Sequence, residues 1–164
     1  MTNELKPTLA NLKKTVRHEA DEPYARYIMR HVSIYFTWVL VRTPITANQV
    51  TLLQEILGIG GAICLGTGRP RMAVVGVILL QLGFVLDLVD GEVARWKNTQ
   101  SITGFYLDQI GHVVVIPIFL FGLGFGVWNQ TGYMEALICA FLSGLFILRL
   151  EKDTMLGVTD KLLH

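Results

Sequence analysis

The chain has 164 residues, about enough for one domain, but its composition is not that of a soluble domain. Hydrophobic residues make up 52% of it and charged residues only 16%, so intrinsic disorder and a coiled coil are both poor explanations. The formal net charge is +1, which argues against binding of nucleic acid through bulk charge. Long uncharged runs instead predict an all-α, polytopic membrane helix bundle.

The first 43 residues divide into a polar and an amphipathic segment. Residues 1–22 lack the apolar stretch of a secretion signal, so we expect a cytoplasmic N-terminal segment. Residues 23–43 are apolar and aromatic, with a polar stripe on one helical face formed by Arg26, Arg30, Ser33 and Thr37. This pattern predicts an amphipathic helix in the headgroup region. A first membrane span is the weaker alternative, because two arginines would have to enter hydrocarbon.

About four transmembrane helices are predicted within residues 44–150. Pro44 breaks the chain, and Thr46 or Asn48 can cap the helix that follows. Runs long enough to cross a bilayer lie at 47–66, at 72–86, around the uncharged run 113–127, and at 133–148.

Basic residues near the ends of these spans are unevenly distributed, which predicts the orientation of the chain. Only Arg69 and Arg71 fall on one side of the membrane. The other side holds Lys13, Lys14, Arg17, Arg26, Arg30, Arg42, Arg95, Lys97, Arg149 and Lys152. We therefore expect a multi-pass protein of a prokaryotic cell membrane, with both termini, including a polar tail at 151–164, in the cytoplasm.

Acidic and small residues share one face at the cytoplasmic end of the second span. Asp87 and Asp90 are three residues apart, and Gly91 and Ala94 extend their face with almost no side-chain bulk. In the third span a second strip repeats every four residues, formed by Gly104, Asp108 and His112. Because a short loop joins the two helices, the two strips can face each other.

Carboxylates at membrane depth are costly, and three of them repel one another unless they are protonated or neutralised. A divalent cation such as Mg²⁺ resolves this, because it binds a few carboxylates together with phosphate oxygens of a substrate. The alternative is that the acids only fix helix packing, by pairing with Arg95, Lys97 or Arg149. That alternative leaves the carboxylate spacing and the neighbouring small residues unexplained.

The pattern from Asp87 to His112 resembles the signature of the CDP-alcohol phosphotransferase family. That signature reads D-x-x-D-G-x-x-A-R, eight residues, then G-x-x-x-D-x-x-x-D. Seven of its eight defined positions match in correct spacing: Asp87, Asp90, Gly91, Ala94, Arg95, Gly104 and Asp108. His112 stands where the last aspartate belongs. The start of the first span is also similar to that of family members, at Ala47, Asn48 and Thr51, so the resemblance covers about residues 23–150.

The resemblance implies a membrane enzyme of phospholipid biosynthesis that uses Mg²⁺ or Mn²⁺. Such an enzyme transfers a phosphatidyl-type group from a CDP-linked donor, such as CDP-diacylglycerol, to an alcohol and releases CMP. The metal ligands would be Asp87, Asp90, Asp108 and His112. The CDP moiety would be bound by Asn48, Thr51, Asp87, Gly91, Ala94, Arg95 and Gly104. His112 and Asp108 would be catalytic, Arg149 would contact the acceptor alcohol, and the protein would be a homodimer.

Two features depart from the family pattern. An imidazole at position 112 can take a proton or bind a metal, and its unperturbed pKa near 6.5 suits a base at neutral pH. It also removes about one negative charge from the site, so a second Mg²⁺ should bind less well. Family members usually carry six spans rather than four. The chain is either a shortened member that completes its pocket by dimerisation or a piece of a longer one, and the sequence does not choose.

Two other functions are compatible with these residues. One is a catalytically silent member that binds CDP-lipid or a partner subunit. The other is an ion or proton carrier, which we rank last because the acids cluster near one face of the membrane. Outside the motif strips, we expect Glu92 to be solvated at the cytoplasmic surface and Glu55 to face the same cavity as the motif acids. We interpret the glycines of the third span as packing residues, namely Gly122, Gly124 and Gly126.

Overall fold

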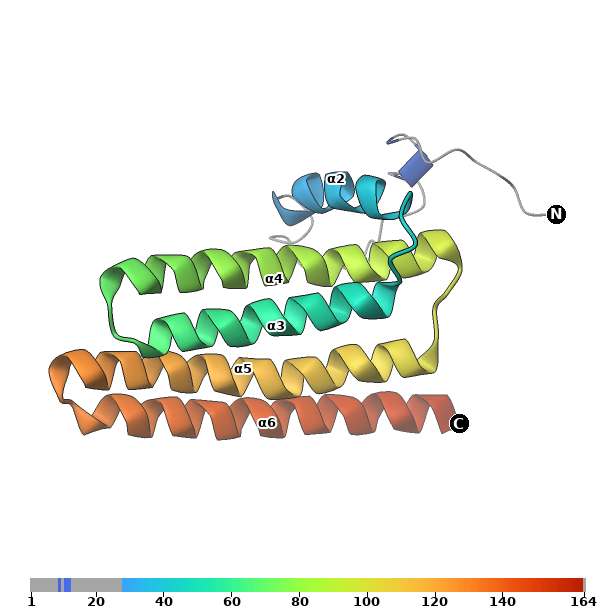
Figure 1. Ribbon diagram of the computed structural model, residues 1–164. Coiled ribbons are helices and arrows are strands. Elements are labelled where there is room, and N and C mark those ends of the chain that lie inside the picture. The colour runs from blue at the N-terminus through green and yellow to red at the C-terminus, as the bar shows by residue number, and fades with distance from the viewer. Residues whose placement is uncertain (1–8, 10, 13–27, 164) are drawn as a thin grey trace. The chain divides into compact units, whose positions relative to one another are not determined.

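The computed structural model describes residues 9, 11–12 and 28–163, with the backbone alone from 153 onward. Its helices are α2 (Arg30–Leu40), α3 (Ala47–Gly66), α4 (Pro70–Lys97), α5 (Ile102–Thr131) and α6 (Met134–Leu163), which are labelled in Figure 1. Within these described residues there is no strand. The predicted all-α class is therefore confirmed.

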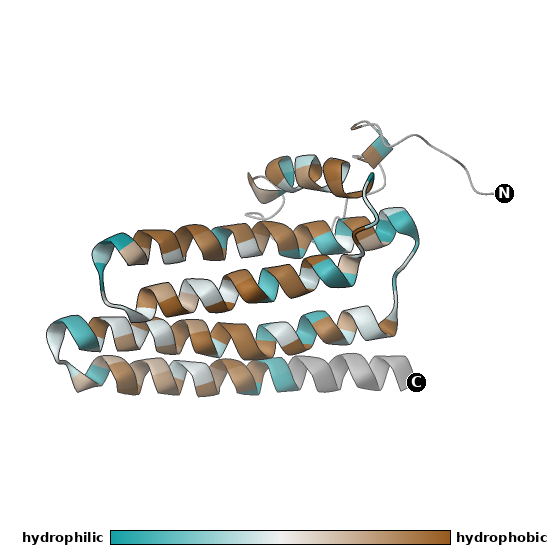
Figure 2. Cartoon of the chain, viewed as in Figure 1, coloured by the Kyte–Doolittle hydropathy of each residue, from teal (hydrophilic) through white to brown (hydrophobic). Residues whose placement is uncertain are grey.

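Among the described residues, three helices are long and apolar enough to cross a membrane: α3, α4 and α5. Figure 2 shows apolar residues along the middle of α4 and hydrophilic residues at its two ends. The fourth predicted span, 133–148, falls in α6, which is not among these three. This helix also continues through Leu163, so residues 151–163 of the predicted tail belong to α6. The protein is a polytopic helical membrane protein.

Local signals explain where the helices of the motif region begin and end. Thr46 and Gln49 form a capping box at the start of α3, in which each side chain binds the other residue's backbone N–H, at 3.3 and 3.0 Å. At the end of α4, Asn98 adopts a left-handed conformation with φ of 53°. The N–H of Thr99 then donates to the carbonyl of Ala94 at 3.0 Å, as in a Schellman motif. The end of α4 and the turn toward α5 are thus determined by residues close to the turn.

The helices form two compact units, and α3, α4 and α5 each contribute to both. Unit 1 contains the described residues up to Gln54 and the segment Leu82–Leu107. Unit 2 contains Glu55–Gln81 and the described residues from Asp108 onward.

In unit 1, α2 lies against the C-terminal half of α4. Leu12 and Ile34 are buried and pack with Leu9, Trp38, Val41 and Trp96. Helix α2 covers 30–40 of the predicted amphipathic segment, and Arg26 lies outside the described residues. Ser33 and Thr37, expected on the polar stripe, are fully buried. Their hydroxyls bind Glu92, so this part of the stripe faces protein rather than headgroups.

In unit 2, small residues let the helices approach closely. A Cβ added to Gly122 would meet the backbone of Ala62, and one added to Gly126 would meet the backbone of Leu65, so α5 and α3 pack backbone to backbone. On another face of α5, Gly124 lies against Ala136 and Ala140 of α6. The interpretation of these glycines as packing residues is confirmed.

Candidate active site

The motif residues of α4 lie on one face because they are spaced by three and four residues. Asp90 is buried, with 8% of its surface exposed, while Asp87, Gly91, Ala94 and Arg95 are partly exposed. The Arg95 guanidinium folds back over Gly91, where its Nη1 lies 3.3 Å from the position of an added Cβ. A side chain at position 91 would therefore displace Arg95. The glycine leaves room for this arginine at the surface of the strip.

Polar residues of α3 orient both α4 carboxylates. The Thr51 hydroxyl donates to Asp90 Oδ2 at 2.5 Å, and the Gln54 amide donates to Asp87 Oδ1 at 3.0 Å. Both pairs are spaced by three residues and run in opposite directions, as antiparallel helices require. Thr51 was expected in the CDP-binding set, whereas Gln54 was missed. The sequence could have indicated this role, since Gln54 lies one turn after Thr51 on the same face of an apolar helix.

Asn48 and Gly104 meet at the start of α3 and α5. The Asn48 side-chain oxygen lies 3.3 Å from the position of a Cβ added to Gly104, within unit 1. The Ser101 hydroxyl accepts from the Gly104 N–H at 3.0 Å and caps α5. Asn48 is exposed and Gly104 is partly exposed, so both are accessible to a ligand that approaches the N-terminal ends of these helices.

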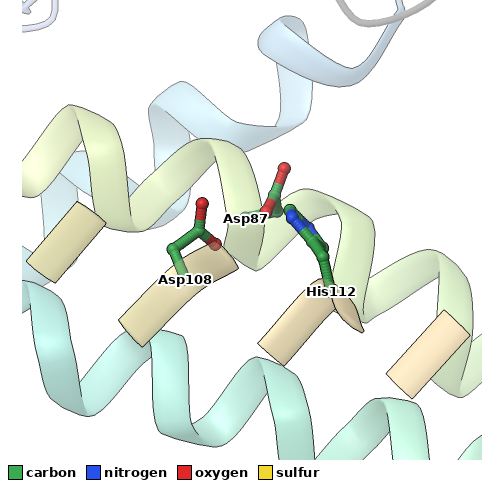
Figure 3. A group of neighbouring side chains, drawn as sticks. All are labelled: Asp87, Asp108 and His112. Atoms are coloured by element: carbon green, nitrogen blue, oxygen red, sulfur yellow. The ribbon is translucent and has the colours of Figure 1, made fainter. Parts of the chain in front are cut away.

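Asp108 and His112 lie on consecutive turns of α5, and both are partly buried. Figure 3 shows them on α5 and Asp87 on α4. Helix α5 is continuous from Ile102, so Asp108 follows Gly104 on the same face. Between the two ligand candidates lies Gly111, where an added Cβ would coincide with the carboxylate of Glu55. Glu55 therefore reaches α5 one residue from His112, at the level of the motif.

Lys97, one of the three bases that the packing alternative would pair with the motif acids, binds the backbone of another segment. The Lys97 ammonium donates to the carbonyl oxygens of Thr43 and Ile45, at 2.8 and 2.7 Å, and so fastens the α2–α3 connection to the end of α4. Arg149 is exposed on α6. Its expected contact with an acceptor stays a prediction.

The expectation that Glu92 is solvated is wrong. Only 1% of its surface is exposed, and its two carboxylate oxygens accept hydrogen bonds from Ser33 and Thr37, at 2.8 and 2.5 Å. These donors come from 59 and 55 residues earlier in the chain. Helical spacing within α4 could not reveal them. Burying an acid is costly unless its oxygens find such partners.

The residues predicted to bind a metal, three aspartates and a histidine, are of types that suit a hard divalent cation. Carboxylate oxygens are the ligands that Mg²⁺ prefers, and an imidazole together with carboxylates also suits Mn²⁺. The hydrogen bonds from Thr51 and Gln54 each occupy one oxygen of a carboxylate and fix its orientation. Such supporting hydrogen bonds are typical of the residues that hold metal ligands in place.

Comparison with known proteins points to the same family as the sequence motif. A model of the family described as CDP-alcohol phosphatidyltransferase matches residues 44–157. A bifunctional IPC transferase and DIPP synthase of Thermococcus kodakarensis is 30% identical over 83% of this chain and 30% of its own length. A phosphatidylinositol phosphate synthase of Streptomyces avermitilis is 33% identical over 71% of this chain and 46% of its own length.

A eukaryotic relative shows the same partial coverage. A CDP-diacylglycerol–serine O-phosphatidyltransferase of Saccharomyces cerevisiae is 27% identical over 73% of this chain and 44% of its own length. The chain thus spans less than half the length of these curated relatives. The matched region includes the whole motif from Asp87 to His112.

Proposed function

The chain belongs to the CDP-alcohol phosphatidyltransferase family, and we propose that it transfers a phosphatidyl-type group from a CDP-linked donor, such as CDP-diacylglycerol, to an alcohol. The relatives named above all carry the names of enzymes that make phospholipids or related phosphodiesters. The observation that carries the proposal is the orientation of Asp87 and Asp90 by Gln54 and Thr51. Two acids in a membrane helix, each held by a hydrogen bond from a neighbouring helix, are expected of a working site rather than of simple packing.

We assign the metal to Asp87, Asp90, Asp108 and His112. Mg²⁺ or Mn²⁺, when bound, neutralises the donor's diphosphate and makes CMP a better leaving group. Asp90 is oriented for this role by the hydrogen bond from Thr51. The resemblance to the family motif supports the participation of Asp108, and His112 stands where that motif has its last aspartate.

The CDP moiety is assigned to the small residues and to the polar residues beside them. Gly91, Ala94 and Gly104 add almost no side-chain bulk beside the proposed position of the base and the ribose. Asn48, whose amide oxygen lies beside Gly104, can bind the nucleotide edge. Thr51 and Asp87 complete the set through the metal-bound end of the diphosphate, and Arg95, folded over Gly91, supplies positive charge.

In the reaction, the acceptor hydroxyl attacks the phosphorus that carries the lipid. The new oxygen–phosphorus bond forms as the bond from that phosphorus to CMP breaks, and CMP leaves with the electron pair. His112 takes the proton of the attacking hydroxyl, next to Asp108 on the preceding turn. Arg149 is proposed to contact the acceptor alcohol. General-base catalysis of this kind contributes about 10²- to 10⁴-fold to the rate.

The proposal places the active site at the cytoplasmic face of a prokaryotic cell membrane. Helix α2 exposes Val32, Tyr35, Phe36 and Val39, which suits a helix that lies among lipid headgroups. A site at the level of the headgroups can be reached by a lipid-anchored donor that stays in the bilayer. We propose that two copies of the chain form a homodimer.

The test is release of CMP from CDP-diacylglycerol by the purified chain, with Mg²⁺ or Mn²⁺, across a panel of alcohols. We expect metal-dependent release that is lost in Asp90→Asn and in His112→Ala but kept in His112→Asp, because a carboxylate can also accept the proton. Release that survives Asp90→Asn would disprove the metal assignment. Binding of CDP-lipid without release with any alcohol would instead indicate a silent member that binds CDP-lipid or a partner.

A further inference from the structure

Glu92 is a buried acid that the proposed chemistry does not use. It lies between Gly91 and the rest of the motif, yet it points away from the motif face and is 1% exposed. Both of its oxygens accept hydrogen bonds from α2, one from the Ser33 hydroxyl and one from the Thr37 hydroxyl. Arg30 of α2 and Arg95 of α4 also interact with it electrostatically. A fully buried carboxylate with this many partners on one short helix fixes that helix to α4.

Helix α4 therefore has two opposite faces, one that packs against α2 and one that carries the motif. At about 100° per residue, Val89, Glu92, Val93 and Trp96 centre on one side, and Asp87, Asp90, Gly91 and Ala94 centre on roughly the opposite side. Val89 and Val93 are fully buried, and Trp96 packs on the cluster formed by Leu12 and Ile34 of unit 1. Helix α2 is thus attached behind the motif. It cannot contact a nucleotide that lies on the motif face.

The other side of α2 is turned away from α4 and is apolar. Val32, Tyr35, Phe36 and Val39 are each between 41 and 60% exposed. An amphipathic helix of this kind takes a defined depth at the boundary of headgroups and acyl chains. Whatever is fixed rigidly to it takes a defined depth as well.

We propose that Glu92 is a positioning residue that sets the depth of the motif helix relative to the headgroup layer through Ser33 and Thr37. The inference rests on the proposed function, since it concerns how that site meets a membrane-held donor. The hydrogen bonds keep Asp87 and Asp90 at the level of the donor's diphosphate. Breaking them impairs reaction with a donor anchored in the bilayer, while soluble CDP still reaches the motif face and binds normally.

The test compares Thr37→Val with Thr37→Ser in vesicles that contain CDP-diacylglycerol. Valine has the shape of threonine but no hydroxyl, whereas serine keeps the hydroxyl. We expect Thr37→Val to raise KM for CDP-diacylglycerol about fivefold with kcat nearly unchanged, since one of two hydrogen bonds to a buried carboxylate is lost. Thr37→Ser should stay within about twofold of wild type, because its hydroxyl can still donate to Glu92.

Binding of soluble CDP, measured by calorimetry with Mg²⁺, is the second measurement. We expect it to be the same in wild type, Thr37→Val and Thr37→Ser. A parallel loss of CDP affinity in Thr37→Val, or an unchanged KM for the lipid donor, would overturn the inference. A wild type that releases no CMP would refute the proposed function instead. If Thr37→Val does not fold, Ser33→Ala, which removes the longer of the two hydrogen bonds to Glu92, takes its place in the same comparison.

A direct measurement of depth does not depend on activity. A nitroxide label on Tyr35→Cys, with Cys64 and Cys139 replaced by serine, reports the position of α2 in vesicles by accessibility to oxygen and to a water-soluble relaxant. A second label on Phe84→Cys reports α4, since Phe84 is 64% exposed. We expect Thr37→Val to change the depth of one label relative to the other. Thr131→Val, which removes a hydroxyl that bonds only at the end of α5 and in the α5–α6 connection, should leave both labels in place. Equal depths in Thr37→Val and wild type would also overturn the inference.

Discussion

At the scale of single residues, the site depends on which neighbour holds each carboxylate. Asp90 is nearly buried and depends on Thr51, which is itself only 3% exposed. Asp87 is more accessible and receives the longer hydrogen bond from Gln54. A hydroxyl or amide that donates to an acid both lowers the cost of burying it and fixes the direction of its other oxygen. The polar residues in the first half of α3 therefore serve the acids of α4.

We predict that Thr51→Val lowers the free energy of unfolding by about 1–3 kcal/mol, because the buried Asp90 carboxylate loses its donor while the shape of the side chain is kept. Thermal unfolding of the detergent-solubilised protein measures this change. Thr51→Ser, which keeps the hydroxyl, is the matched control and should unfold near the wild-type temperature. Equal unfolding temperatures for Thr51→Val and Thr51→Ser would show that the hydrogen bond does not support Asp90.

At the scale of helices, contacts between α3 and α5 decide the packing of unit 2. Gly122 and Gly126 meet backbone atoms of α3, and backbone cannot move aside as a flexible side chain does. Gly60 of α3 differs, because a Cβ added there would have only one atom within contact distance, a side-chain carbon of Leu79 at 3.8 Å. Glycines in this membrane protein are thus not equivalent. Those whose added Cβ would meet the backbone of a neighbouring helix, as at the α3–α5 contact, are required for close approach.

We predict that Gly122→Ala destabilises the protein by about 1–3 kcal/mol, the usual cost of overpacking, because the added methyl group forces α5 away from Ala62. Gly60→Ala, the control, should be neutral or slightly stabilising, since alanine favours a helix and the space is open. The unfolding temperatures of both variants decide the matter. A Gly122→Ala protein as stable as Gly60→Ala would contradict the close contact described for these helices.

At the scale of the whole chain, orientation in the membrane follows from charge. The α3–α4 connection carries Arg69 and Arg71, whereas the α4–α5 connection follows Arg95 and Lys97. The distribution of basic residues predicts that the second connection lies in the cytoplasm. Because the motif adjoins that connection, the same argument predicts that the proposed site faces the cytoplasm.

We predict that cysteines introduced at Thr67 and Gln100 are labelled from opposite sides of the membrane. Both positions are exposed, and the experiment uses a background without Cys64 and Cys139. A membrane-impermeant thiol reagent applied to intact bacterial cells should label the cysteine at position 67 but not the one at position 100. After permeabilisation both should react. Labelling of position 100 in intact cells would reverse the assigned orientation.

The sequence alone was enough for several features that depend on neighbours a few residues away. Apolar runs gave the spans of α3, α4 and α5, Thr46 was one of the two predicted caps, and the motif led to the family. Helix length, capping and motif spacing are local properties, so they are readable without a fold. The assignment of metal, nucleotide and acceptor residues remains a prediction.

The tertiary structure alone decided the partners of buried polar side chains. Glu92 was expected in solvent and is instead held by α2, Gln54 emerged as the residue that holds Asp87, and Lys97 binds the α2–α3 connection. Each of these contacts joins residues at least 33 positions apart in the chain. Whether an acid is solvated or buried depends on what a distant segment places against it. Periodicity within one helix gives the face on which a residue lies, but not the element that covers that face.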